Sequence, residues 1–518
     1  KLSMASVFLF LAPLGLPELL RNYLQYFAIA FKYKAELLVI LTIHRSTLCY
    51  FKSKHWVLEM NRILENFITT IIHITLIFCF PSLSGASDFP KQKSFIVMDG
   101  SCCGGEESDP HAVHGIQTES GAFVLSGKII DRSGYEDGFV VKVPHSLPDG
   151  QIFLHPEEEF NLEWTVKIGK MNKRDGINAT ASLQGAIFAG GYLQNPNGVI
   201  NGYLVKLSEN SGDLIWARSF PSKFKNKESA IETVIRSADN AILVAGVINA
   251  DKDTLEGFKS YGNPVSGDAF VMYFSEKQVT SKIAPESPIW ELKIKDALAV
   301  KHMEELPSGD GFLLAVHGDE EPAIAKVIKI SFDGRKMWEL DIPKHGELTA
   351  ITVTENGYFL SGHKADNFDG IDASISKISL NGEFLWNKSF GNPKGGGLIF
   401  SGLDEGDPRL IYDECWGITE FKNGLVLACG TGIEHCEDLG DDLISVCEND
   451  PRNTWRSNLI YVDFSGNLIW QRASSFVFEG EDGEDLPSTA SEWVFITKSG
   501  NLASVVDLSF GVGLEILK

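Results

Sequence analysis

A short phrase that ends in tryptophan recurs along the chain, and it constrains the fold more than any other feature. Residues 201–216 read NGYLVKLSENSGDLIW, and residues 374–386 read SISKISLNGEFLW. Each copy alternates apolar and polar residues on both sides of a turn rich in Gly, Asn or Asp, a pattern typical of a β-hairpin. Six tryptophans mark the copies: Trp164, Trp216, Trp290, Trp338, Trp386 and Trp470. We expect these side chains to pack between neighbouring units.

A second phrase precedes the first and supplies two more strands to each unit. It reads AITVTENGYFLSG at 350–362 and WGITEFKNGLVLACG at 416–430. Four short strands in a unit of roughly 40–50 residues are typical of a β-propeller blade. The last unit, 491–518, supplies three strands, and residues 94–105 supply a strand ahead of the first unit. The sequence therefore predicts an all-β fold, a seven-bladed β-propeller of four-stranded blades, with its ring closed by an N-terminal strand that completes the last blade.

The repeat GYLVKLSENSGDLIW resembles the secreted, PQQ-like and WD40-like propeller repeats of bacterial and marine eukaryotic surface proteins, over residues 94–518. The resemblance implies a fold rather than an activity. Quinoprotein dehydrogenases share the Gly-x-x-x-Trp ending of a blade, but the calcium and quinone ligands that they need are not identifiable here. Cys102–Cys103 is similar to the vicinal disulfide of some of them, although this pair lies at the predicted ring closure rather than inside a blade.

The beginning of the chain has the layout of a secretory signal peptide. Met60 is followed by Arg62, an apolar run over 67–80 and Pro81, and small residues precede Ser87. We expect residues 1–59 to be an upstream translation or gene-model artefact, residues 60–86 to be the signal peptide, and residues 87–518 to form one propeller domain. A start at Met4 with a membrane-embedded N-terminus is the alternative, but the apolar run is short for a transmembrane helix.

A signal peptide implies a secreted, extracellular protein, or a periplasmic or cell-surface one in a bacterium, with no membrane span in the mature chain. Six cysteines follow residue 86, an even number that suggests disulfides without fixing their pairing. They are Cys102, Cys103, Cys415, Cys429, Cys436 and Cys447. We predict at least one disulfide among the last four, and either Cys415–Cys429 or Cys429–Cys436 fits. Asn178 and Asn387 begin glycosylation sequons.

Charge limits the partners that this chain can have. The formal net charge is −23, and such a surface repels nucleic acid and anionic membranes. It suits cations, cationic partners or simple solubility. The turns within the two hairpins of a unit are short, except for residues 144–161 in the first unit, so the long insertions are expected on one face.

The longest insertions, at 391–413, 431–455 and 471–490, are rich in carboxylates. Oxygen ligands of this kind suit Ca²⁺, although a solvated acidic surface accounts for them equally simply and no EF-hand spacing is present. The candidate calcium ligands are Glu434, Glu437, Asp438, Asp441, Asp442, Glu481, Asp482 and Asp485.

The innermost strands of a propeller line its central channel, and several polar or aromatic residues stand where these strands begin. A metal site, acid–base chemistry or a hydrogen-bonded rim would each use such residues. The channel-mouth candidates are His111, His114, Asp175, Glu228, Glu414, Trp416, Glu492 and Trp493. No Ser–His–Asp order, phosphate loop or His-Glu-x-x-His motif is present, so no catalytic residue is assigned.

Two functions fit these observations. The first is a secreted propeller that binds an extracellular protein, a glycan or a small molecule, with an acidic long-loop face that binds calcium. The alternative is a propeller enzyme, an oxidoreductase, lyase or lactonase-like hydrolase, which uses a metal or quinone at the channel mouth.

Overall fold

The computed structural model describes residues 90–99, 109–130, 133–147, 149–154, 162–170, 172–252, 266–318, 324–365, 371–391, 411–433, 455–474, 488–508 and 511–518. The chain divides into two compact units, Lys1–Ala86 and Ser87–Lys518. The first unit lies outside the described residues, and the predicted artefact and signal peptide lie there with it. None of the helices in the described ranges is long and apolar enough to cross a membrane.

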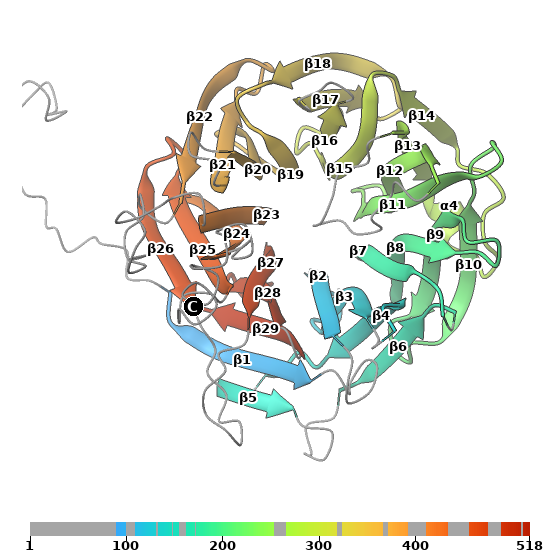
Figure 1. The fold of residues 1–518 in the computed structure, drawn as a ribbon, viewed down its shortest axis with the longest axis horizontal. Helices are drawn as coiled ribbons and strands as arrows, with labels where there is room; N and C mark the ends of the chain where they lie inside the picture. The colour runs from blue at the N-terminus through green and yellow to red at the C-terminus, as the bar shows by residue number, and fades with distance from the viewer. Residues whose placement is uncertain are drawn as a thin grey trace, which may run out of the picture. The chain divides into compact units, whose positions relative to one another are not determined.

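Antiparallel sheets make up the second unit, as the period-two pattern predicts (Figure 1). Four of these sheets contain four strands each. They are β2 (Asp109–Gln117), β3 (Phe123–Ile130), β4 (Glu136–Val143) and β6 (Trp164–Ile168); β7 (Asp175–Leu183), β8 (Ala186–Gln194), β9 (Ile200–Ser208) and β10 (Leu214–Phe220); β11 (Lys227–Arg236), β12 (Ile242–Asp251), β13 (Asp268–Phe274) and β14 (Trp290–Ile294); and β15 (Ala297–Glu305), β16 (Gly311–Gly318), β17 (Ala325–Ser331) and β18 (Lys336–Ile342).

The next eight strands are joined into one sheet, which differs from the four-stranded units that the sequence predicts. A single parallel pair, Ile371 with Tyr412, links its two halves. Each half is otherwise an antiparallel set of four. The strands are β19 (Glu347–Thr354), β20 (Gly357–Ala365), β21 (Ile371–Ile378) and β22 (Phe384–Phe390), followed by β23 (Ile411–Phe421), β24 (Gly424–Ile433), β25 (Arg456–Asp463) and β26 (Leu468–Ser474).

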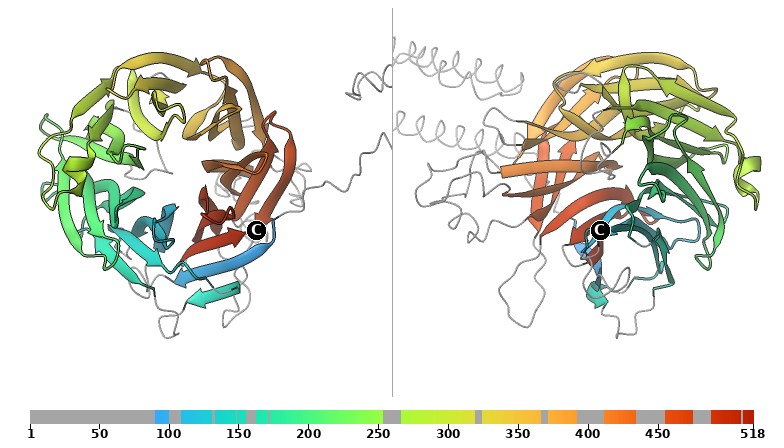
Figure 2. Two further views of the ribbon diagram at one scale, coloured as in Figure 1. Left: turned by 180° about the vertical axis from the view of Figure 1, so that it is seen from behind. Right: turned by 45° about the vertical axis from the view of Figure 1, so that its right-hand side comes forward.

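The last sheet combines the two ends of the described chain. It contains β27 (Thr489–Ile496), β28 (Leu502–Leu508), β29 (Gly511–Leu517), β1 (Gln92–Asp99) and β5 (Gly150–Leu154). β1 pairs antiparallel with β29, and β5 pairs parallel with β1. Figure 2 shows β1 in blue between β29 and β5. This fifth strand was not predicted, and it comes from the insertion at 144–161.

The sequence predicts a short turn between the third and fourth strands of every unit except the first. This prediction is wrong for the sheet β11–β14. Residues 275–289 connect its third and fourth strands and contain the helix α4 (Glu276–Thr280). The helix begins with a capping box in which Ser275 and Gln278 bond each other's backbone. Its buried residue, Val279, joins the core beside Trp216. The insertion therefore covers the tryptophan of the preceding sheet.

The repeated tryptophan packs against the next sheet along the chain, as the sequence predicts. Trp164 contacts the turn before β10, and Trp290 contacts the turn before β18. A Cβ atom at Gly212 or Gly334 would lie 2.9 Å or 2.6 Å from the respective indole. Both glycines also have positive φ, 73° and 79°, so the turn needs glycine for two reasons. The Trp164 and Trp290 Nε1 groups donate to Glu209 O and Phe332 O.

The first strands of the successive sets lie innermost around a common axis (Figure 1). β2, β7, β11, β15, β19, β23 and β27 contact one another in this order, and β27 also contacts β2. Apolar side chains fill the space between the sheets; Leu313 and Val327 of one sheet, for example, cluster with Ile351 and Leu360 of the next. The fold thus presents the start of each inner strand at the same end of the axis.

Candidate functional site

Each innermost strand carries a bulge at the same position. Equivalent side chains of these strands therefore lie at the same height along the axis. In all seven of these strands a residue at the same position is skipped in the pairing with the second strand, as in a β-bulge, and β15 also skips Leu298 nearer its start. The skipped residues are Val113, Asn178, Glu232, Lys301, Thr349, Trp416 and Glu492. Two of these, Trp416 and Glu492, are among the sequence-predicted candidates.

Two predicted mouth carboxylates hold the backbone in place. Asp175 is fully buried and accepts hydrogen bonds from the N–H groups of Lys170, at 2.6 Å, and Gln194, at 2.7 Å. Burial raises the pKa of Asp175 to about 6, although these two N–H groups lower it. Glu228 is also fully buried and accepts from the N–H of Ile200 at 3.0 Å. Their contacts indicate a structural role.

His111 and His114 lie on the same strand but make different contacts. His111 is partly exposed, and its Nδ1 lies 2.8 Å from Asp507 Oδ2 on β28. His114 is buried, and its Nδ1 accepts the N–H of Thr180 on the next innermost strand at 3.3 Å. That bond links β2 to β7, so His114 also contributes to the packing of the strands.

The aromatic candidates meet a residue that sequence reasoning missed. The Trp493 ring lies 4.7 Å from the His114 ring and 5.1 Å from the His302 ring, centroid to centroid. His302 is on β15 and accepts the N–H of Ile351 at 3.2 Å. Each of the three rings follows directly after the skipped residue of its strand, and β15 is not a chain neighbour of β27. We call Trp493, His114 and His302 the aromatic group; it lies across the axis.

Ionisable side chains from three consecutive strand sets also gather near the starts of the innermost strands. We define the charged cluster as Lys301, His317, Glu347, His363 and Glu414. His363 Nε2 on β20 donates to Glu347 Oε2 on β19 at 3.2 Å, and the His363 side chain is only 9% exposed against 22% for Glu347. The charges of Lys301 on β15 and His317 on β16 lower the pKa of Glu347. The carboxylate of Glu414 on β23 raises the pKa of His363.

The charges in this cluster separate the protonation states of its members. Burial lowers the pKa of His363, but the carboxylates of Glu347 and Glu414 raise it overall, to about 8. Burial raises the pKa of Glu347, but the charges of His363 and Lys301 bring it down to about 2. Burial and the Lys301 ammonium lower the pKa of His317 to about 4. At neutral pH the cluster therefore holds an imidazolium, a carboxylate and a neutral imidazole.

A signal in the repeat would have revealed Glu347. Glu347, Glu414 and His111 all stand two residues before the skipped residue of their strands, where β7, β11, β15 and β27 have glycine or alanine. Alignment of the units on this position selects all three. His363 and His317 lie on second strands, and only the strand pairing brings them to the mouth.

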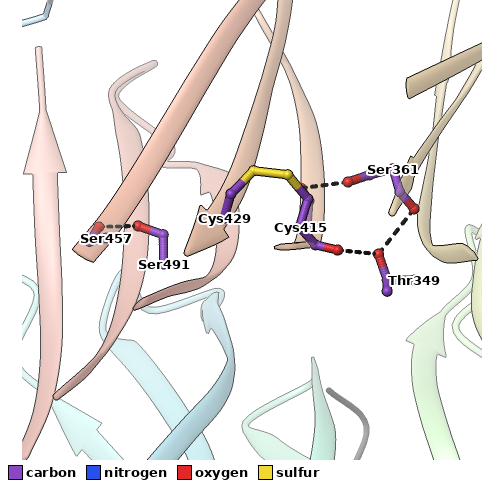
Figure 3. Close-up of a disulfide and its surroundings, with 7 residues drawn as sticks. Thr349, Ser361, Cys415, Cys429, Ser457 and Ser491 are labelled. Atoms are coloured by element: carbon purple, nitrogen blue, oxygen red, sulfur yellow. Dashed lines mark hydrogen bonds between the residues drawn. A yellow bond between two sulfur atoms is a disulfide. The ribbon is translucent and has the colours of Figure 1, made fainter. Parts of the chain in front are cut away.

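The prediction of at least one disulfide among the last four cysteines is confirmed, and of the two pairings left open the structure has Cys415–Cys429 (Figure 3). The two cysteines are directly paired across β23 and β24, and both are fully buried. Thr349 on β19 donates its hydroxyl to Cys415 O at 2.8 Å and to Ser361 O at 3.0 Å. The backbone of Cys415 also contributes to the raised pKa of His363, so the disulfide adjoins the charged cluster.

One glycosylation candidate is wrong for the folded chain. Asn178 is fully buried and its amide donates to Ile231 O at 2.8 Å, which leaves no room for a glycan. The Asn387 amide donates to Ser374 Oγ and Ser376 Oγ, and its glycosylation stays a prediction. Cys102, Cys103, Cys436 and Cys447 lie outside the described residues, as do all eight calcium candidates. Across the described ranges, no group of three or more His, Cys, Asp or Glu is arranged to hold a metal ion.

No protein-family model matches the sequence, and no curated protein matches it. Solved structures do resemble it. Hydrazine synthase of Kuenenia stuttgartiensis is 9% identical with a TM-score of 0.42, over 80% of this chain and 93% of that one. A europium-containing methanol dehydrogenase is 8% identical with a TM-score of 0.38, over 81% and 92%. The quinohemoprotein alcohol dehydrogenase of Comamonas testosteroni is 10% identical with a TM-score of 0.37, over 84% and 77%. At these scores the likenesses carry no inference about activity or cofactor.

Proposed function

We propose that residues 87–518 form a secreted, seven-bladed β-propeller that binds a ligand through the charged cluster at the mouth of its axis. The finer account of the fold is that each innermost strand belongs to one blade and that β1 closes the ring as the fourth strand of the last blade. Its support is the pairing of β1 with β29 and the contact of β27 with β2. The pairing of β5 with β1 would hold the ring closed at a second point.

The Glu347–His363 ion pair is the observation that carries the binding proposal. Removing charged groups from water is costly, so a mostly buried cluster of this kind is more typical of a functional site than of a plain core. Lys301 is 1% exposed and His363 is 7% exposed, and both remain beside carboxylates from other strands. A polar ligand at the mouth would contact groups from three blades at once, and the ligand class is an extracellular protein, a glycan or a small polar molecule.

A screen of glycans and small polar molecules against the full chain tests this proposal. Thermal shift measurements should give ligands whose effect is lost in the double variant E347Q/H363Q and kept in E383Q, which changes an exposed turn residue. Ligands that shift both variants equally would place binding elsewhere. Absence of any ligand for the wild-type chain would remove the support for a binding module.

Acid–base catalysis is the second candidate, because two histidines of the cluster have opposite pKa shifts. His363, with a pKa of about 8, could donate a proton at neutral pH, and His317, with a pKa of about 4, could accept one. Lactone and ester hydrolysis and lyase activity, measured against pH, test this reading. Activity should fall above pH 8 and vanish in H363Q.

Calcium binding by the acidic insertions remains a separate proposal, which rests on their sequence alone. Oxygen-rich loops suit a hard cation. Their candidate ligands adjoin β24 and β26 in the chain, so the proposed site would be tethered close in sequence to the strands that hold the disulfide.

A further inference from the structure

The skipped residues of the innermost strands form a second feature, which shares only Lys301 with the charged cluster. Asn178 on β7 and Glu232 on β11 are the skipped residues of two consecutive innermost strands. The Asn178 Nδ2 group donates to the carbonyl of Ile231, the residue before Glu232, at 2.8 Å. The Asn178 side chain therefore lies beside the backbone next to Glu232, and the two residues hold the same position in their strands.

Both side chains hold an acceptor that receives no hydrogen bond. Asn178 is fully buried and Glu232 is 6% exposed, yet Asn178 Oδ1 and Glu232 Oε2 have no donor among the described residues. Buried polar atoms are satisfied in the great majority of cases, and an unpaired carboxylate is the most costly exception. Within the described part of the chain, Glu232 makes no ion pair, whereas the buried Glu136 and Glu515 pair with Lys128 and Arg472.

Asn178 Oδ1 and Glu232 Oε2 are both hydrogen-bond acceptors, so a ligand that binds them has to supply donors. A donor-rich cation would satisfy them together, whereas an anion or a pure acceptor would be repelled. A metal ion is a poor fit, because the described residues offer no group of three or more His, Cys, Asp or Glu to complete its coordination. An organic ammonium needs fewer protein ligands, since its N–H groups can each find one acceptor.

Aromatic side chains occupy the next position along three other innermost strands. Trp493, His114 and His302 follow the skipped residues of their own strands, and both histidine rings contact the Trp493 ring. Aromatic faces attract cations and also contact alkyl groups. The negative charge of the whole chain, −23, favours the approach of a cation.

We propose that Glu232 and Asn178 bind a small primary ammonium compound on the axis, with N–H groups on Glu232 Oε2 and Asn178 Oδ1 and the alkyl part toward the aromatic group. This site lies on β7 and β11, outside the charged cluster, and does not depend on the function proposed for that cluster. Glu347 and His363 can be replaced without removing either acceptor.

Thermal shift and calorimetric titration of the full chain with propylammonium chloride test the proposal. Tetramethylammonium chloride, which has no N–H, and sodium and calcium chloride at matched ionic strength are the comparison salts. Propylammonium should raise the Tm of the wild type and of E383Q in a saturable manner. E232Q should bind it roughly tenfold or more weakly, because a hydrogen bond to a charged group is lost.

Several results would overturn the site. Equal responses to propylammonium and tetramethylammonium would exclude recognition of N–H groups, and a response confined to calcium would assign the acceptors to a metal. Unchanged affinity in E232Q would place the cation elsewhere. If E232Q does not fold, the wild-type comparison of the two ammonium salts still decides, because no heat and no specific shift with propylammonium also contradicts the proposal.

Discussion

The start of β7 and the start of β19 occupy nearly the same place in the repeat, and both carry a carboxylate with a shifted pKa. At Asp175 both oxygens receive backbone N–H groups, and burial raises the pKa to about 6. At Glu347 the partner is the His363 side chain, and the pKa falls to about 2. One carboxylate is fixed by its own loops, while the other faces ionisable groups from neighbouring sets of strands.

This difference separates structural from functional candidates better than residue type does. A carboxylate bonded to backbone amides is held in place by them, and its charge stabilises the local fold. A carboxylate bonded to another side chain can exchange that partner when a ligand or a proton arrives. The β7 side should therefore determine stability, and the β19–β23 side should determine binding.

The largest effect is expected for D175A. The substitution removes the acceptor of the Lys170 N–H and one of two acceptors of the Gln194 N–H, which also donates to Arg174 O at 3.1 Å. Each such loss costs about 1–3 kcal/mol, so the free energy of unfolding should fall by about 4 kcal/mol. E228A, which frees only the N–H of Ile200, should cost about half as much. Urea denaturation measures both, and equal small losses would show that these carboxylates are not structural.

Removal of the disulfide is the next largest change. In the double variant C415A/C429A the unfolded chain is no longer cross-linked over its 14-residue separation. The expected loss is about 3 kcal/mol. Because Cys415 adjoins His363, we also expect this variant to weaken ligand binding at the charged cluster, unlike D175A. Ligand affinity measured well below the unfolding temperature distinguishes the two, and identical affinity in both variants would separate the disulfide from the site.

The sequence predicts the sheets well and the charged cluster poorly. The alternation and the turns of the 374–386 phrase are local, so β21 and β22 follow from them directly. The Glu347–His363 pair depends on register across a hairpin, and the contact of Trp493 with His302 depends on packing around the axis. Such contacts have no local signature. The helix α4 was missed because residues 275–289 are polar and irregular, so their pattern favours a loop.

The pH dependence of stability should show the ion pair. The pKa of His363 in the folded chain, about 8, exceeds its ordinary value of 6.5, so its contribution is complete below pH 6.5 and is lost as the pH rises to 8. The pKa of Glu347, about 2, lies below its ordinary value of 4.5, so its contribution is complete above pH 4.5 and is lost toward pH 2. Both groups therefore contribute their full stabilisation between pH 4.5 and pH 6.5.

The stabilisation by His363 corresponds to about 2 kcal/mol. Denaturation at pH 6 and at pH 8.5 should show this decrease in the wild type and in D175A. Burial raises the pKa of Glu304 to about 8, so Glu304 adds a decrease of its own over the same range, and E347Q should keep only that part. An equal decrease in E347Q and in the wild type would assign the pH dependence to groups other than the ion pair.

Calcium should have the smallest effect. At a concentration tenfold above its dissociation constant, binding to the folded state alone adds about 1.4 kcal/mol. Thermal melts in calcium, magnesium and chelator measure it, and magnesium should do less because it sheds water reluctantly. Equal melts in all three would show that the acidic insertions are a solvated surface.

The pKa of the His363 imidazole, measured by NMR titration of the full chain, tests the central claim most directly. The account predicts a value of about 8 in the wild type and in D175A, because Glu347 and Glu414 stabilise the imidazolium. In E347Q the value should fall to 6.5 or below, since burial then prevails over the remaining carboxylate. A wild-type value at or below 6.5, or a value of about 8 that persists in E347Q, would contradict the assignment of this pair as the centre of the site.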